Sequence, residues 1–211
     1  MPKVVDKEQK SEEIARAALR VFRELGYHRT RMADIAREAC VGKGTLYEYF
    51  RDKADILRRA FDDYFTAFKA GAMEALQRAA GPSERLLALV DFALSHTQEW
   101  EDHCAVYVDY FGAARTGGGD LFSLANIYAE VRGLLAPLIE EGQAAGEIAA
   151  DLEPGATAQL LLSIFEGLVL YRIFEQEHGG AESVRSMARL LARKLLVVPT
   201  QGPAPNTKGD D

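Results

Sequence analysis

Residues 43–49 (KGTLYEY) carry side chains suited to recognising a polar, charged polymer. If the stretch is helical, Leu46 and Phe50 lie on one face and the opposite face is polar. That face and its flank hold Lys43, Gly44, Thr45, Tyr47 and Glu48. Amines, hydroxyls and carboxylates hydrogen-bond to base edges in the major groove of DNA, and glycine permits close backbone approach. The segment therefore predicts a surface that reads DNA bases.

Four neighbouring residues are suited to contact phosphates. Two are cations and two carry hydroxyls: Arg29, Lys53, Thr30 and Tyr49. Contacts of this kind position a protein on DNA without reading its sequence. We expect these residues on the DNA backbone, and the residues of 43–48 nearest the bases.

Two preceding helices must position this surface. Apolar residues recur at i, i+3 and i+4 up to Leu25, which predicts an amphipathic helix, and Gly26 is suited to end it in the left-handed conformation. Thr30 is expected as the N-cap of a second helix whose inward side includes Ile35 and Ala36. With the helix over 43–49, this order predicts a helix-turn-helix.

A long fourth helix is expected directly after the polar stretch. Asp52 is suited to cap it, and Asp55 lies three residues on, as in a capping box. The charge is divided near this point. Residues 1–53 hold 12 Lys and Arg against 9 Asp and Glu, a net charge of +3, and the remaining residues carry −10, which together give the −7 of the chain. Positive charge thus gathers on the segment expected to bind DNA.

Three motifs, "TRMADIA", "VGKGTLYEYF" and "DKADIL", make the chain resemble the TetR-like family of one-component bacterial repressors. The resemblance is strong over residues 11–60, with looser matches at 140–148 ("EEGQAAGEI") and 164–171 ("IFEGLVLY"). It implies an all-α fold of about nine helices, a dimer that binds a palindromic operator, and a small effector that releases the DNA. Residues 1–53 would form the DNA-binding domain and 54–197 the effector-binding and dimerisation domain.

Two positions depart from the family pattern. Cys40 stands in the turn where glycine is common, so a residue with a side chain must adopt or avoid a strained geometry. Gly42 stands where a serine cap is common, which glycine replaces at a small cost. These departures bear on the geometry of the turn rather than on the predicted function. A redox role for Cys40 is open, although a cysteine that only fills a turn is the commoner case.

The body is expected to contain six helices separated by glycine and proline. We predict them over about 53–80, 83–99, 102–115, 120–145, 154–178 and 180–197. The tail over 198–211 is rich in proline and lacks an apolar face, which predicts disorder. With no signal peptide, no run of 18 uncharged apolar residues and no cysteine pairing, we expect a cytoplasmic protein without a membrane segment.

Aromatic side chains gather on the body helices, where the resemblance implies an effector pocket. The predicted ligand-binding set is Phe65, Phe68, Trp100, His103, Tyr107, Tyr110, Phe111, Tyr128, Phe165 and Glu166. Each aromatic residue has the alternative of ordinary core. If Asp109 or Glu166 faces inward, a cationic aromatic effector is expected, and otherwise a neutral or hydrophobic one.

The last two helices are expected to form a homodimer interface. Residues 158–171 are apolar nearly all round, and 184–196 carry a continuous apolar stripe. One subunit would leave part of this surface uncovered, so pairing with a second copy as a four-helix bundle is the economical solution. The alternative is a monomer in which the other helices cover it.

Other chemistry finds little support in the sequence. His96, His103 and Cys104 lack the spacing of metal ligands, and no nucleophile–base pair, phosphate loop or cofactor fingerprint is present. We expect no enzyme, metal or cofactor. The main hypothesis is a repressor released by a hydrophobic or aromatic effector. The alternatives are a co-regulator or activator whose body binds a protein, and an enzyme on a helical scaffold. The sequence names neither operator nor effector.

Overall fold

The computed structural model describes residues 7–114, 124–174 and 181–196, and every regular element within these ranges is an α-helix. The bounds are α1 Lys7–Leu25, α2 Met32–Glu38, α3 Lys43–Tyr49, α4 Lys53–Gln77, α5 Pro82–Ser95, α6 Thr97–Ala114, α7 Leu124–Ala144, α8 Pro154–Phe174 and α9 Ala181–Leu196. The all-α expectation is therefore confirmed. The predicted tail over 198–211 lies outside the described residues.

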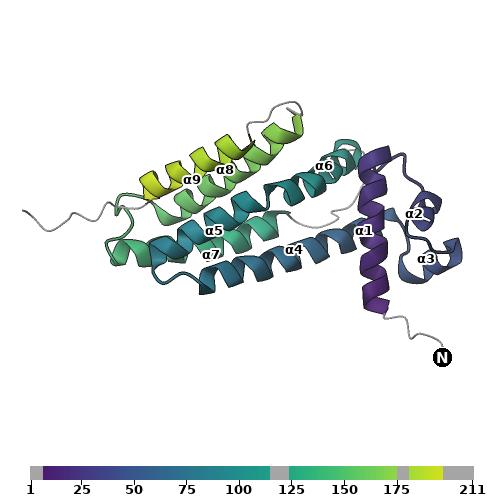
Figure 1. Cartoon of the computed structure of the whole chain (residues 1–211), viewed down its shortest axis with the longest axis horizontal. Helices are drawn as coiled ribbons and strands as arrows, with labels where there is room; N and C mark the ends of the chain where they lie inside the picture. Colours follow the sequence, from purple (N-terminus) through teal and green to yellow (C-terminus); the bar gives the residue numbers. More distant parts are fainter. Residues whose placement is uncertain (1–6, 115–123, 175–180, 197–211) are drawn as a thin grey trace, which may run out of the picture.

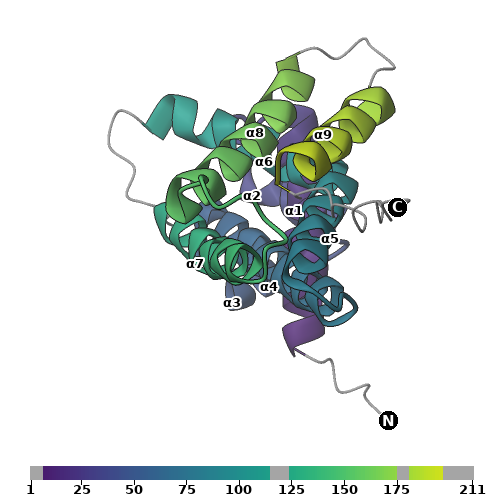
Figure 2. The same ribbon diagram turned by 90° about the vertical axis from the view of Figure 1, so that its left-hand side faces the viewer.

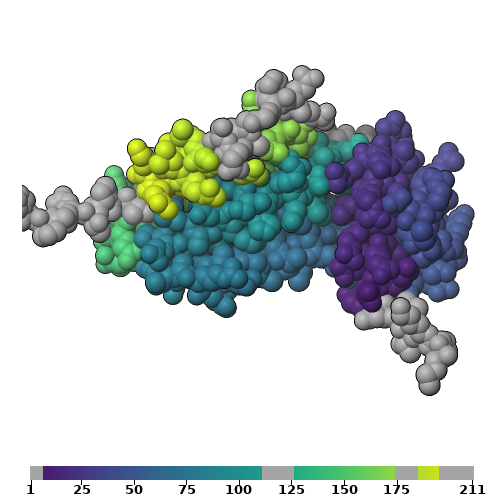
Figure 3. Space-filling model, viewed as in Figure 1, coloured from purple at the N-terminus to yellow at the C-terminus, as the bar shows by residue number. Residues whose placement is uncertain are grey.

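A small head of α1, α2 and α3 lies at one end of an elongated body (Figure 1). Helix α1 stands across the end of the body and packs on α4 and α6, as the space-filling view also shows (Figure 3). In the body, α4 packs on α5, α5 on α7, and α8 on α6 and α7. Helices α8 and α9 lie on one side of the molecule in both ribbon views (Figure 2). The head is thus held by two body helices, α4 and α6.

The end of α1 follows the prediction and the start of α2 does not. Gly26 has φ +83°, and its N–H donates to the Phe22 carbonyl at 2.8 Å, as expected of a glycine that ends a helix. Arg31 is the N-cap of α2, and its N–H donates to the Asp34 carboxylate at 3.0 Å. The prediction of Thr30 as this cap is wrong, because its hydroxyl donates backwards to the Gly26 carbonyl at 2.8 Å.

The turn between α2 and α3 contains a left-handed residue, although that residue is a cysteine and not a glycine. Cys40 has φ 52°, in the left-handed region where a side chain costs free energy, and the Val41 N–H closes the turn on the Ala36 carbonyl at 2.9 Å. Gly42 is the N-cap of α3, without a side-chain hydrogen bond. Leu46 and Phe50 are buried as predicted, so α3 is anchored by one face only.

Helix α4 begins as predicted. Asp52 caps it by accepting from the Asp55 N–H at 2.8 Å. The Asp55 carboxylate in turn accepts from the Arg51 N–H at 3.2 Å, so the reciprocal bond reaches one residue before the cap.

The boundary between α5 and α6 was predicted wrongly. The break falls at His96, where the His96 N–H donates to the Phe92 and Ala93 carbonyls, and not between residues 99 and 102. Thr97, whose hydroxyl donates to the Leu94 carbonyl, starts α6 at once. No glycine or proline marks this place, which explains the error. The start predicted for α7 at residue 120 and the end predicted for α8 near 178 lie outside the described residues.

A single apolar cluster joins the head to the body. It runs from Ile14, Phe22 and Leu46 in the head to Trp100 in α6 and Val169 in α8, all almost fully buried. A second cluster, around Leu86, Ile139 and Ile148, fills the far end of the body. Because the first cluster is continuous, movement of the body helices changes the packing under the head.

By length and apolar composition, Pro154–Ile173 of α8 meets the requirement for a membrane span. Core helices of soluble proteins meet the same requirement, so the observation is weak evidence. Helix α8 contacts α6 and α7 and carries Arg172, which pairs with Glu101 of α6. These are contacts of a bundle helix, although only a small part of this span is buried within one chain.

Close packing at the end of α7 gives a test of the fold. A methyl group on Gly142 would lie 2.6 Å from Ile148 Cγ1 and 3.3 Å from its Cβ. We expect Gly142→Ala to lower the free energy of unfolding by about 1–3 kcal/mol through overpacking. Gly133→Ala in the same helix meets nothing within 4 Å and should raise it by up to about 1 kcal/mol. Urea unfolding measures both, and equal effects of the two substitutions would contradict this packing.

Candidate nucleic-acid interface and effector site

Helix α3 presents the predicted base-facing residues to solvent. Lys43, Gly44, Tyr47 and Glu48 are exposed and Thr45 is half-buried, on the helix whose inner face buries Leu46. Tyr47 is 49% exposed. A methyl group on Gly44 would meet nothing within 4 Å, so packing inside the chain does not require glycine there.

The four residues predicted at phosphates occupy different environments. Arg29 is exposed, its Nε donating to the Leu25 carbonyl, and Tyr49 is half-buried against the apolar cluster. Thr30 is only 2% exposed, and its hydroxyl is engaged inside the head. The Lys53 ammonium points inward, donating to the Tyr27 carbonyl at 2.6 Å and to the His28 carbonyl at 3.4 Å. In this conformation the Thr30 side chain is not available at the surface of the head.

No sequence pattern singles out Tyr27, which lies where the head meets the body. Its N–H donates to Asp109 Oδ2 of α6 at 2.6 Å, and its ring lies edge-on to Tyr110 with centroids 5.0 Å apart. The Lys53 ammonium lies 4.5 Å from the centroid of the same ring. Burial, with the nearby Tyr110, raises the pKa of Tyr27 to about 12. No local pattern predicts this cluster, because it forms only when α6 packs beside the connection between α1 and α2.

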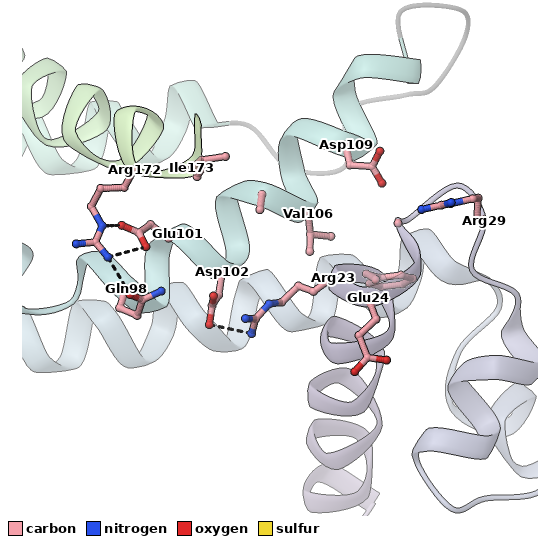
Figure 4. A pocket seen from close by; sticks show the side chains of 13 residues that line it. Arg23, Glu24, Arg29, Gln98, Glu101, Asp102, Val106, Asp109, Arg172 and Ile173 are labelled. Atoms are coloured by element: carbon pink, nitrogen blue, oxygen red, sulfur yellow. Dashed lines mark hydrogen bonds and ion pairs between the residues drawn. The ribbon is translucent and has the colours of Figure 1, made fainter. Parts of the chain in front are cut away.

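A polar hollow of about 400 Å³ opens between the head and the body (Figure 4). Ion pairs cross its floor: Arg23 pairs with Asp102 at 2.9 Å, and Arg172 pairs with Glu101. None of the predicted ligand-binding residues lines this hollow or the smaller one between α1 and α4. The hollow therefore does not correspond to the expected effector pocket.

Most of the predicted effector residues meet in one aromatic core between α4, α6 and α8. Tyr64 stands at its centre, with ring centroids 5.6 Å from Trp100, 5.8 Å from Phe68 and 4.2 Å from His103. Phe65 lies 5.4 Å from Trp100. The core also includes Tyr107 and Phe165. Tyr110 lies elsewhere, beside Tyr27, and the side chain of Phe111 is outside the described residues.

Glu166 places a carboxylate in this aromatic core. The Trp100 indole N–H donates to Glu166 Oε2 at 3.4 Å, and the Tyr128 hydroxyl forms a second hydrogen bond. Burial raises the pKa of Glu166, and the two hydrogen bonds oppose that shift. Burial also lowers the pKa of His103, whose Nδ1 donates to the Glu99 carbonyl at 2.7 Å. The core thus holds an acid and a weakly basic imidazole among rings.

The two candidate sites divide the chemistry between them. Helix α3 offers donors and acceptors on an open surface, whereas the aromatic core offers ring faces and one half-buried carboxylate. Among the described side chains, no three His, Cys, Asp or Glu residues are arranged to hold a metal ion. The arrangement suits binding rather than a covalent reaction.

Family models match both parts of the chain. One, described as "Bacterial regulatory proteins, tetR family", matches residues 14–60, and another, described as "BetI-type transcriptional repressor, C-terminal", matches residues 82–197. The chain belongs to the TetR family of bacterial transcriptional regulators. This confirms the resemblance carried by the motifs, and proteins of this family regulate transcription rather than catalyse reactions.

Individual relatives agree with this assignment. The transcriptional regulator AcuR of Cereibacter sphaeroides is 30% identical over 162 residues, covering 74% of this chain and 73% of that protein. FadR from Bacillus subtilis in complex with stearoyl-CoA has a TM-score of 0.69 and 23% identity, covering 85% of this chain and 96% of that one. A regulator from Saccharomonospora viridis in complex with choline has a TM-score of 0.75 and 23% identity, covering 90% and 98%. At these identities the two structures show the shared fold.

Proposed function

We propose that this chain is a ligand-responsive transcriptional repressor, which binds a palindromic operator as a dimer and is released by a small effector. The observation that carries the proposal is the outward face of α3. Gly44, in the first turn of that helix, is a poorer helix former than alanine, and no contact among the described residues explains its presence. A partner whose surface comes close to the helix backbone does explain it. The match to a repressor family over residues 82–197 supports repression over activation.

The proposal assigns two kinds of DNA contact. The exposed face of α3 would read bases in the major groove, and Arg29 with Tyr49 would contact phosphates. Base contacts discriminate among sequences, whereas phosphate contacts strengthen binding to all of them.

Tyr47 and Tyr49 allow these roles to be separated. With an operator selected from random DNA, we expect Tyr47→Ala to reduce the preference for the operator over single-base variants by about 5- to 150-fold at the contacted position. Tyr49→Phe should weaken binding to all these sequences alike. Fluorescence anisotropy at fixed salt measures both. An unchanged preference in Tyr47→Ala would remove Tyr47 from the base-reading surface.

The proposal also assigns the dimer interface to α8 and α9. Both helices expose large apolar side chains: Leu160, Ile164, Leu170, Tyr171, Met187, Leu190 and Leu191. Leu160 is 60% exposed, and Met187 is 54% exposed. Several exposed large apolar side chains on two helices are typical of an interaction site, and a two-fold axis would bring α8 and α9 against their copies. Such a dimer would place two α3 helices on half-sites roughly 34–36 Å apart, or a multiple of that.

Two exposed methionines provide a matched test of the interface. We expect Met187→Glu in α9 to yield a monomer, because the carboxylate would be buried at the interface without a partner. Met73→Glu in α4, where the side chain is 43% exposed, should leave the dimer intact. Sedimentation equilibrium measures the mass of each variant. A dimeric Met187→Glu protein would contradict the assignment of the interface.

For the effector we propose a small organic cation held in the aromatic core. Ring faces and a half-buried carboxylate together attract a cation, and Glu166, Trp100 and Tyr64 supply both. An acyl chain in the same place would leave the Glu166 carboxylate against methylene groups. The choline complex of the related structure therefore resembles the chemistry of this core more closely than the stearoyl-CoA complex does.

Trp100 is the one tryptophan of the chain and lies in this core, so its fluorescence reports binding. We expect Glu166→Gln to weaken binding of choline at least about 10-fold. Burial raises the pKa of Glu166, so acidification neutralises it sooner than an ordinary glutamate, and the wild-type affinity should fall as pH drops through that pKa. The variant should lose this pH dependence. Glu130→Gln, on the surface of α7, is the control. Binding of stearoyl-CoA but not of choline would contradict the proposal.

A further inference from the structure

Both backbone groups of Tyr27 are bound to body helices. On one side its N–H donates to Asp109 of α6 at 2.6 Å, and on the other its carbonyl accepts from Lys53 of α4 at 2.6 Å. The Asp109 carbonyl also accepts from His28 Nε2 at 3.1 Å. The connection between α1 and α2 is thus held from two directions by two different helices.

Side-chain packing also holds Tyr27 between the head and the body. Tyr27 is 7% exposed, and its ring contacts Phe22 of α1 and Tyr110 of α6, with centroids 5.1 and 5.0 Å away. Glycine at position 26 eases the approach of Asp109, since a methyl group there would lie 3.3 Å from Asp109 Oδ2 and the carboxylate would have to shift slightly. Its φ of +83° gives a second, independent reason for glycine.

The two helices that hold Tyr27 also form the aromatic core. Helix α6 carries Trp100, His103 and Tyr107 before it reaches Asp109, and α4 carries Tyr64 and Phe65 after Lys53. An effector that separates the rings of α4 and α6 therefore displaces the two helices that hold Tyr27. Rigid helices transmit such a displacement along their length.

We propose that Asp109 is the positioning residue through which movement of α6 is passed to the head. Lys53 holds the same connection between α1 and α2 from α4 instead of binding a phosphate. This inference rests on the proposed function, because it explains how an effector in the aromatic core changes DNA affinity. Two of the three ammonium donors of Lys53 are engaged with carbonyls of the head. The ion pair between Arg23 and Asp102 also joins α1 to α6, but it links two partly exposed side chains and not the backbone of the connection, and such pairs contribute little.

Asp109→Ala removes the acceptor of the Tyr27 N–H. In the wild type, a saturating quaternary ammonium probe such as choline should weaken operator binding about 5- to 150-fold. In Asp109→Ala the probe should still quench or shift Trp100 fluorescence, yet change operator affinity less than 2-fold. Asp109→Asn keeps an acceptor oxygen at this position and should restore most of the release. Asp102→Ala, on the same helix, should respond like the wild type.

The outcomes of this experiment distinguish the role of Asp109 from the proposed function. Full release in Asp109→Ala contradicts the role of Asp109 and leaves the proposed function standing. A wild-type protein that binds the probe without releasing DNA, or that does not bind it, contradicts the proposed function and the inference that rests on it. Release in Asp109→Asn that stays as low as in Asp109→Ala would also overturn the hydrogen-bonding role.

The role of Lys53 is tested without an effector. Lys53→Met should lower operator affinity while leaving the slope of log affinity against log salt unchanged, because no phosphate contact is lost. Arg29→Met, at the exposed cation assigned to a phosphate, should reduce that slope by about one. A slope reduced by about one in Lys53→Met would return Lys53 to the phosphate-contacting set.

Discussion

The structure depends on one continuous apolar core that begins under α3 and ends at α8. Leu46 anchors α3 by a single face, and the same cluster continues through Phe22 and Tyr27 to Trp100. Because protein interiors pack at crystal-like density, the parts of such a core do not rearrange separately. A reading surface and an aromatic core at opposite ends of one cluster are therefore mechanically connected.

Two carboxylates beside this core, half-buried Glu166 and exposed Asp109, are features that apolar packing alone does not explain. Glu166 is kept among rings although burial raises its pKa, and Asp109 turns its carboxylate towards a backbone N–H of the head. Partial burial of the Glu166 carboxylate costs free energy, which its hydrogen bonds to Trp100 and Tyr128 offset. In our account Glu166 binds the effector, and Asp109 passes the resulting movement of α6 to the head.

Local patterns predicted the parts of the fold that local forces determine. Gly26 ends α1, Asp52 caps α4, and Leu46 with Phe50 faces inward, because each rests on spacing or on a single turn. Thr30 was misplaced because its hydroxyl can reach either forward to α2 or back to the Gly26 carbonyl. The break at His96 carries no glycine or proline and left no signal.

The candidate site was predictable only in part, for a related reason. The exposed face of α3 follows from helical periodicity, and the gathering of aromatic residues on α4, α6 and α8 was visible in the sequence. The inward direction of Lys53 depends on how the start of α4 meets the connection between α1 and α2. The contact between Tyr110 and Tyr27 depends on how α6 packs against the head. Contacts between residues more than 80 positions apart leave no trace in a single sequence.

If an effector moves α6 and α4 and these hold the head of each subunit, the spacing of the two heads in the dimer must change, and this is the central claim of our account. Cys40 is exposed in the turn of the head, whereas Cys104 is buried and its pKa is raised by burial to about 11, so a thiol-reactive spin label selects Cys40. The distance between the two labels in the full-length dimer, measured by pulsed electron–electron double resonance, is the most direct test. We predict one distance on the operator and a shift of several ångströms, outside the operator-bound distribution, when choline saturates the protein. An unchanged distance with bound effector, or no measurable coupling between labels, would contradict the account.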